Sequence, residues 1–205
     1  MTLLPPQQPE TDAVLVGQIA GGDAGAFGEL YRRRRGDVFR FALHMTGSRA
    51  VAEDVAQDVF LAVMRCAARY VPSRSVVAAW LCGIARNCVR QRLDRDRPFV
   101  PLASVADGEG VGPAVQPDPL GDLARAEGIE KLRRVVLALP LQYREAVVLC
   151  DLQELSYADA AAAMRCRVGT VRSRLHRGRE LLAAKLGAER RQDRPATVKG
   201  ARCTA

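Results

Sequence analysis

A proline-rich stretch at residues 98–119 constrains this chain more than any other feature of its sequence. Five prolines fall within it, with glycines between them: Pro98, Pro101, Pro113, Pro117 and Pro119. Proline lacks a backbone N–H and its ring clashes with the preceding turn, so a helix cannot run through this composition. The stretch predicts a flexible linker, residues 98–121, between two separately folded blocks at residues 12–97 and 122–186.

Both blocks carry the pattern of amphipathic helices. Apolar residues recur every three to four positions, aromatic residues make up only 5% of the chain, and no alternating β-branched runs stand out. The 48% of hydrophobic residues is enough to supply two small cores. The predicted fold class is therefore all-α, with two small helical domains, a disordered Pro- and Gln-rich N-terminus at residues 1–11 and a loose basic tail at residues 187–205.

Positive charge is concentrated at both ends of the chain. The formal net charge is +8, and it divides into +4 over residues 1–98, −4 over residues 99–127 and +8 over residues 128–205. Such asymmetry fits a polyanionic partner, most simply nucleic acid, although a solvated surface is an equally ordinary explanation of charge alone. Whether the charge binds nucleic acid or is only solvated therefore depends on how it is arranged on the predicted helices.

Several function classes have no support in the sequence. No apolar run is long enough to span a membrane and no secretory signal is visible, so we expect a cytoplasmic protein. The six cysteines show no zinc-ligand spacing, which predicts no metal site and no cofactor. His44 and His176 have no acid and nucleophile arranged around them as a catalytic triad requires. We therefore expect a protein that is not an enzyme.

The predicted helix after Ser48 has an acidic face with an apolar centre. Ser48 is placed to cap the helix, and Val55, Val59 and Val63 fall on its buried side. The opposite face gathers Glu53, Asp54, Gln57, Asp58 and Leu61. A solvated acidic face would explain the charges, but a leucine among them is more typical of a protein-binding surface with an apolar centre and a polar rim.

The next predicted helix, before the linker, presents Arg86, Asn87 and Arg90 on one side. Arginines one turn apart can meet successive phosphates, and an asparagine can both donate to and accept from a base edge. Without further context, an ordinary solvated arginine-rich face is the simpler interpretation.

The second block ends in a more specific pattern. Ser156 and Asp159 form a capping signal before an Ala-rich helix, and a short turn at residues 165–167 leads into a basic amphipathic helix. Six arginines and no acidic residue lie between Arg165 and Arg179. The face opposite the apolar stripe carries Gly169, Thr170, Ser173, His176 and Arg177, and Arg172 and Arg174 flank this face on either side. This order predicts a helix-turn-helix unit whose second helix reads base edges, in preference to a bland helical hairpin.

Taken together, the motifs resemble RNA polymerase sigma factors of the extracytoplasmic-function type. The segments AEDVAQDVF (52–60), WLCGIARN (80–87), LPLQYREAVVL (139–149) and VGTVRSRLHRGRELL (168–182) are similar to motifs of that family and occur in the family's order. The chain departs from the family pattern at several positions, including Gly178, where alanine is usual.

The resemblance implies a factor that joins core RNA polymerase and directs it to promoters. It implies that the acidic face at residues 53–61 docks on the clamp helices of the largest polymerase subunit. It also implies that Arg86, Asn87 and Arg90 meet the minus-ten element, and that the face of the last helix at residues 170–177 reads the minus-thirty-five element. An anti-sigma protein of unknown identity is implied as a further partner.

Two other functions remain open from the residues alone. A stand-alone helix-turn-helix regulator would bind a two-fold symmetric operator without polymerase. An enzyme acting on nucleic acid would need a metal or general-base constellation, which the sequence does not show.

Overall fold

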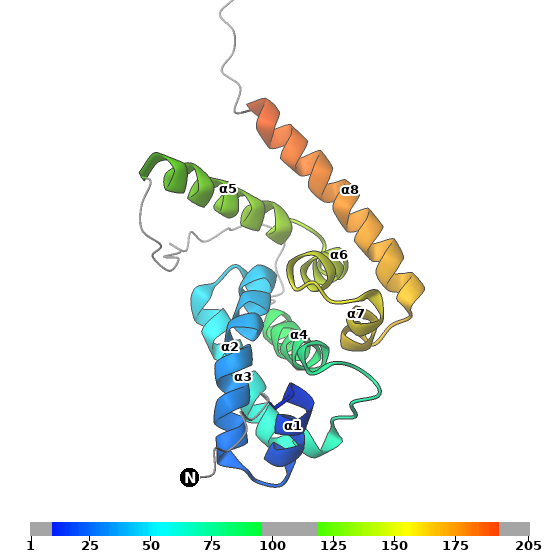
Figure 1. Cartoon of the computed structure of the whole chain (residues 1–205). Helices are drawn as coiled ribbons and strands as arrows, with labels where there is room; N and C mark the ends of the chain where they lie inside the picture. Colours follow the sequence, from blue (N-terminus) through cyan, green and yellow to red (C-terminus); the bar gives the residue numbers. More distant parts are fainter. Residues whose placement is uncertain (1–9, 96–118, 193–205) are drawn as a thin grey trace, which may run out of the picture.

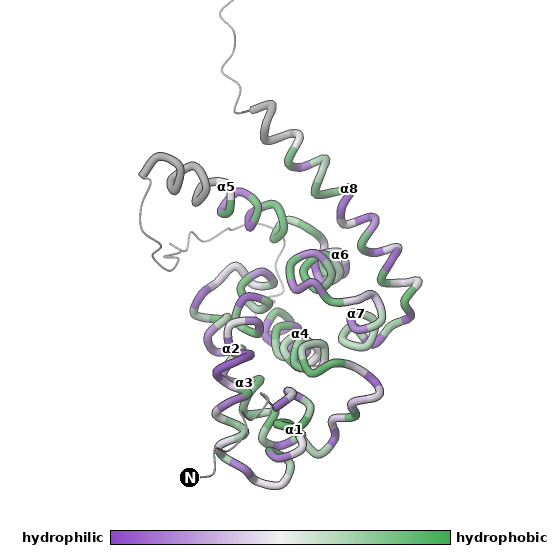
Figure 2. The backbone as a smooth tube through the Cα atoms, viewed as in Figure 1, coloured by the Kyte–Doolittle hydropathy of each residue, from purple (hydrophilic) through white to green (hydrophobic). Residues whose placement is uncertain are grey.

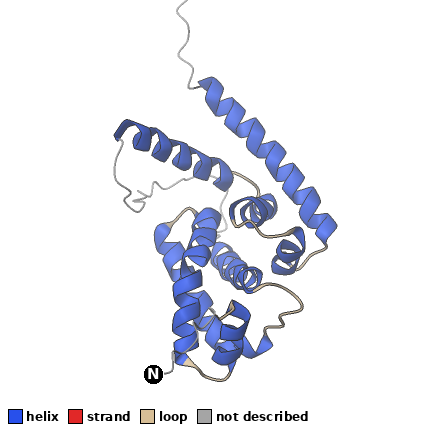
Figure 3. Ribbon diagram, viewed as in Figure 1, coloured by secondary structure: helices blue, strands red, loops and turns tan. Residues whose placement is uncertain are grey.

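The computed structural model describes residues 10–95 and 119–192, with side chains in the second range described from residue 128 to residue 187. All regular elements in these residues are helical (Figure 3). The first half contains α1 (Asp12–Ala20), α2 (Ala24–Thr46), α3 (Arg49–Cys66), the 3₁₀ turn η1 (Ala67–Arg69) and α4 (Val77–Arg95). The second half contains α5 (Pro119–Leu137), α6 (Leu141–Val147), the π-helical turn η2 (Val148–Leu152), α7 (Tyr157–Met164) and α8 (Val168–Gln192). The predicted all-α class is confirmed.

Local capping chemistry explains where several helices begin and end. Ser48 accepts a hydrogen bond from the backbone N–H of Val51, and Ser156 accepts one from that of Asp159, as the sequence predicts. Gly47 ends α2 in the left-handed conformation at φ 73°. Arg165 ends α7 in the same conformation at φ 52°, which lets the chain turn sharply into α8.

The predicted segment boundaries shift at three places. The helix α5 begins at Pro119, inside the predicted linker, because proline is well accepted in the first turn of a helix. The helix α8 continues past Leu186 to Gln192, because residues 187–192 are mostly good helix formers. At the N-terminus, Thr11 caps α1 and the carbonyl of Glu10 accepts a hydrogen bond from Arg33 at 2.6 Å. The predicted disorder of residues 1–9, the predicted linker at residues 98–118 and the tail from residue 193 lie outside the described residues, as do residues 96–97 of the predicted first block.

The core of the first half forms between α2, α3 and α4. Buried apolar side chains come from all three helices: Leu30, Phe41, Met45, Val55, Val59, Val63, Leu81, Ala85 and Val89. These positions recur at helical spacing, so each helix turns one apolar side inward and leaves its other side free for polar residues. The exposed faces of α3 and α4 are therefore set by this packing.

In the second half, α8 packs against α6 and α7. Val171 and Leu175 of α8 are buried in the same apolar cluster as Val147, Val148 and Leu149. Hydrophilic and hydrophobic residues alternate along α8, which lies on the outside of the molecule (Figure 2). This arrangement gives the predicted helix-turn-helix pair of α7 and α8.

The two halves are in direct contact (Figure 1), and their buried apolar side chains form one continuous core. The helix α4 packs against α7, and α2 packs against α5. Arg144 of α6 donates to the backbone carbonyl of Met45 at 2.7 Å, and the backbone N–H of Val76 donates to Asp159 at 3.3 Å. The sequence predicts two domains on a flexible tether; the structure adds an interface between them that the sequence does not indicate.

Candidate nucleic-acid and protein interface

The acidic face of α3 has the exposure that the sequence predicts. Leu61 is 42% exposed, whereas Val59 and Val63 on the other side of the helix are fully buried. Glu53, Asp54 and Gln57 are exposed and Asp58 is half-buried. Met64, one turn after Leu61, is 51% exposed and extends the apolar centre. A large apolar side chain in water, ringed by carboxylates, is a feature of partner-binding surfaces.

Arg92 of α4 reaches this face, a feature that the sequence analysis missed. Its guanidinium nitrogens lie 3.0 Å from Asp54 and 2.6 Å from Asp58. The hydrogen bonds to these carboxylates raise the pKa of Arg92, against the opposing effect of its partial burial. Because the carboxylates are exposed, these pairs add little to stability. Their consequence is to hold Asp54 and Asp58 in place beside Leu61.

The arginine face of α4 is partly covered in this structure. Arg86 is 8% exposed and Arg90 is half-buried, and both meet Glu145 of α6. Arg90 forms a two-pronged contact, with Nε 2.6 Å from Oε1 and Nη2 3.1 Å from Oε2. Asn87 is half-buried on the same helix. The helix pattern predicts that Arg86 and Arg90 face solvent. Instead Arg86 is buried, and Arg90 is bound to Glu145 while 39% of its side chain stays exposed.

The face of α8 is open. Arg172, Ser173, His176 and Arg177 are exposed, while Thr170 and Arg174 are half-buried. The buried side of the same helix carries Val171, Leu175 and Gly178, so the two faces are divided as the sequence predicts. A helix with an arginine-rich free face, preceded by a supporting helix and a tight turn, has the geometry needed to enter the major groove of DNA.

Three contacts of side chains on α8 were not predicted. Glu180 lies 2.9 Å from Arg177 and 3.3 Å from His176, and the hydrogen bond from Arg177 lowers the pKa of Glu180. The Arg172 guanidinium lies over the ring of Tyr157, 5.7 Å from its centroid. Glu180 lies one turn beyond His176 and Arg177, so their i,i+4 and i,i+3 spacing was the signal available in the sequence.

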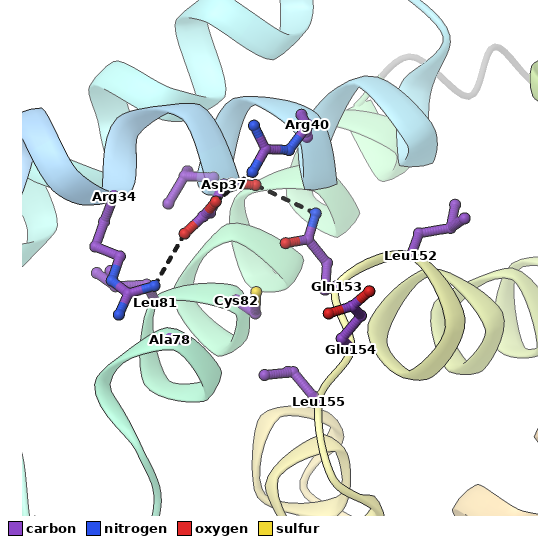
Figure 4. Close-up of a pocket in the computed structure, with 11 residues that line it drawn as sticks. Arg34, Asp37, Arg40, Ala78, Leu81, Cys82, Leu152, Gln153, Glu154 and Leu155 are labelled. Atoms are coloured by element: carbon purple, nitrogen blue, oxygen red, sulfur yellow. Dashed lines mark hydrogen bonds and ion pairs between the residues drawn. The ribbon is translucent and has the colours of Figure 1, made fainter. Parts of the chain in front are cut away.

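A pocket of about 320 Å³ lies where α2, α4 and the loop after η2 meet (Figure 4). Three of its charged groups, all from α2, pair with one another: Arg34 lies 3.0 Å from Asp37, which also pairs with Arg40. Cys82 lines it with a buried thiol, and burial raises the pKa of this thiol to about 12. Because residues of both halves line the pocket, it belongs to their interface.

The part of the chain that the structure describes contains no cluster of side chains that could hold a metal ion. No group of three or more His, Cys, Asp or Glu side chains comes together there. The five cysteines in that part are free thiols, and Cys203 lies outside it. Over the same residues no helix is long and apolar enough to cross a membrane.

Comparison with known proteins matches the two halves to two family profiles in order. Residues 30–98 match Sigma-70 region 2, and residues 129–182 match Sigma-70, region 4.

Curated relatives share about a third of their residues with this chain. ECF RNA polymerase sigma factor SigE of Mycolicibacterium smegmatis is 33% identical over 80% of this chain, which spans 63% of that relative's length. SigM of Mycobacterium tuberculosis is 33% identical, over 86% of this chain and 85% of the relative. SigW of Bacillus subtilis is 30% identical, over 82% and 93%.

Solved structures agree with this result. CnrH in complex with the cytosolic domain of CnrY is similar over 88% of this chain and 99% of the solved one, at 28% identity and a TM-score of 0.65. Sigma factor RpoE in complex with the anti-sigma factor NepR, from Bartonella quintana, is similar over 82% and 98%, at 25% identity and a TM-score of 0.61.

Proposed function

The chain belongs to the sigma-70 family, in its extracytoplasmic-function group, and from this we propose that it binds core RNA polymerase and directs it to start transcription at particular promoters. The observation that carries the proposal is the pairing of both family regions in one chain with an exposed face on each: the leucine-centred acidic face of α3 and the basic face of α8. Sigma factors as a family are not catalytic enzymes, and this chain acts by binding.

The acidic face of α3 is the polymerase-docking surface in this proposal. Leu61 supplies the apolar centre, and Glu53, Asp54, Gln57 and Asp58 supply the polar rim. A desolvated apolar side chain surrounded by polar contacts is the usual source of binding energy at a protein interface. We assign the clamp helices of the largest polymerase subunit as the partner, and the cytoplasm as the place where the two meet.

Promoter DNA is shared between the halves. In the second half, residues 122–186, the α8 face reads the minus-thirty-five element in the major groove, through Thr170, Arg172, Ser173, Arg174, His176 and Arg177. In the first half, residues 12–97, Arg86, Asn87 and Arg90 meet the minus-ten element and help to hold it open. Neither half needs to bind DNA tightly alone, because attachment to one polymerase raises the local concentration of both.

Anti-sigma proteins are proposed as regulators. The sigma factor RpoE of Bartonella quintana was solved with the anti-sigma factor NepR, and that sigma factor shares the fold and 25% of its residues with this chain. The partner of this chain is not identified by its sequence. A stand-alone helix-turn-helix regulator has no support from the comparisons, because it would not require a region 2 half.

Transcription with purified components tests the proposal. Core RNA polymerase lacking any sigma factor is mixed with the chain and a library of genomic fragments, and the 5′ ends of the RNA are sequenced. The expected result is a defined set of start sites that share two spaced sequence elements. Start sites no different from those of core enzyme alone would refute the function, and two-fold symmetric binding sites found without polymerase would favour the stand-alone regulator.

A matched pair of variants tests the docking surface. Leu61→Arg should weaken binding to core polymerase, and the double variant Asp54→Arg with Leu61→Arg should abolish it, without unfolding the chain. Val14→Arg is the control, because Val14 of α1 is also an exposed apolar residue, 47% exposed. A pull-down in which the double variant still retains core enzyme would remove the assignment of this face.

A further inference from the structure

Glu145 is a fully buried carboxylate at the boundary between the two halves. Its exposed fraction is 0%, and it lies on α6 among the apolar side chains of Ala146, Val147 and Val148. Burying a charge is costly unless counter-charges and hydrogen bonds compensate for the lost water. The partners of Glu145 therefore indicate what this position does.

Those partners are two arginines one turn apart on α4. Arg90 holds both carboxylate oxygens with its guanidinium fork, at 2.6 and 3.1 Å. Arg86 Nε lies 3.0 Å from Oε1 without the alignment of a hydrogen bond, so it contributes mainly charge. The hydrogen bond and the charge of Glu145 raise the pKa of Arg90. Arginine recognises a carboxylate and a phosphate with the same fork.

The rest of this side of α4 is covered by the same neighbours. At Gly83, one turn before Arg86, an added Cβ would lie 3.5 Å from the backbone of Ala163 in α7. Before the start of α4, the N–H of Val76 donates to Asp159 of α7. In Figure 1, α4 lies beside α6 and α7, whereas α8 lies on the outer side of the second half. DNA and the second half cannot occupy this side of α4 at the same time.

We propose that Glu145 is an internal phosphate mimic: it holds α6 and α7 on the arginine face of α4, and this contact must break before the face can take promoter DNA. The inference rests on the proposed function, since it concerns the face assigned to the minus-ten element. The basic face of α8 stays open in the closed form, so the closed form blocks one DNA-binding face and leaves the other accessible.

Binding of the full chain to single-stranded DNA, without polymerase, tests the mimic. The probe is a fluorescein-labelled oligonucleotide of mixed sequence, followed by anisotropy at fixed salt, and the radius of gyration is measured in parallel by small-angle X-ray scattering. Glu145→Gln removes the negative charge and should raise the radius of gyration. It should also raise the affinity for the oligonucleotide about tenfold or more, because molecules in the closed form do not bind DNA through α4 and so lower the apparent affinity. The gain should vanish when Arg86→Ala and Arg90→Ala are added.

A second variant keeps the test decisive if Glu145→Gln does not fold. Gly83→Leu places a side chain between α4 and α7 and should also open the molecule, while Gly83→Ala is the matched control, since a single methyl fits at 3.5 Å. A folded Glu145→Gln chain whose radius of gyration and DNA affinity are unchanged would overturn the mimic. A gain in DNA affinity that survives the loss of both arginines would also overturn it. If only Gly83→Leu folds, an unchanged radius of gyration for Gly83→Leu would overturn it.

The two proposals fail separately. If the wild-type chain selects start sites but these variants change neither the radius of gyration nor DNA binding, only the proposal about Glu145 is refuted. If the variants open and bind DNA more tightly but the wild-type chain selects no start sites, only the proposed function is refuted.

Discussion

Gly178→Ala should destabilise the second half, although the change improves helix propensity. Gly178 lies within α8, where replacing glycine by alanine normally gains about 1 kcal/mol. Here the added Cβ would lie 2.7 Å from Cγ2 of Val147 and 3.3 Å from the carbonyl oxygen of Tyr143. Carbon atoms pack best at roughly 3.5–4.0 Å, so the methyl group overlaps α6 by about 1 Å.

The magnitude follows from two opposing terms. Overpacking a tight contact costs about 1–3 kcal/mol, which exceeds the propensity gain at the centre of that range. We expect a net loss of about 1 kcal/mol. The control lies in the same helix: an added Cβ at Gly187 meets nothing within 4 Å, so Gly187→Ala should gain about 0.5–1 kcal/mol.

Urea denaturation followed by far-ultraviolet circular dichroism measures both variants against the wild type. The two substitutions are chemically identical and share one helix, so a difference of about 2 kcal/mol between them isolates the contact of α8 with α6. Equal stabilisation by both would show that α8 is not seated this closely. Since α8 carries the proposed DNA-reading face, Gly178→Ala should also weaken use of the minus-thirty-five element.

Two further predictions concern single side chains. Arg177→Ala should weaken the minus-thirty-five interaction of the holoenzyme by about 1–3 kcal/mol, and equal losses on native and scrambled elements in a binding titration would contradict a base-reading role. Burial, with Arg133 and Arg40 nearby, lowers the pKa of His44 from its ordinary 6.5. The unfolded chain therefore takes up this proton first, and stability falls as the pH drops below about 6.5. Denaturation midpoints of His44→Gln should fall less over this range, and an unchanged slope would refute the assignment.

Helix positions and their exposed faces follow from local rules. The caps at Ser48 and Ser156, the exposure of Leu61 and the open face of α8 all agree with expectations from spacing and side-chain chemistry. These features depend on residues within one or two turns of each other, so they can be deduced without knowing the fold. The ends of α5 and α8 were less predictable because proline and charged residues are compatible with helix ends.

The partners of those faces depend on contacts between distant parts of the chain. Arg92 meets Asp54 38 positions away, and Arg90 meets Glu145 55 positions away. Glu145 has one visible signal in the sequence, an acidic residue in the largely apolar segment LPLQYREAVVL, but this signal does not identify a partner.

The sequence by itself therefore determined an all-helical chain in two blocks, with an acidic face centred on Leu61 and a basic face on α8, because periodicity and capping act over a few residues. Only the tertiary structure decided that the halves share a core and that the arginine face of α4 turns inward onto Glu145. The sequence pattern of a polar helix face is the same whether its side chains bind water or a buried carboxylate. Only the folded arrangement brings the carboxylate of Glu145 to this face.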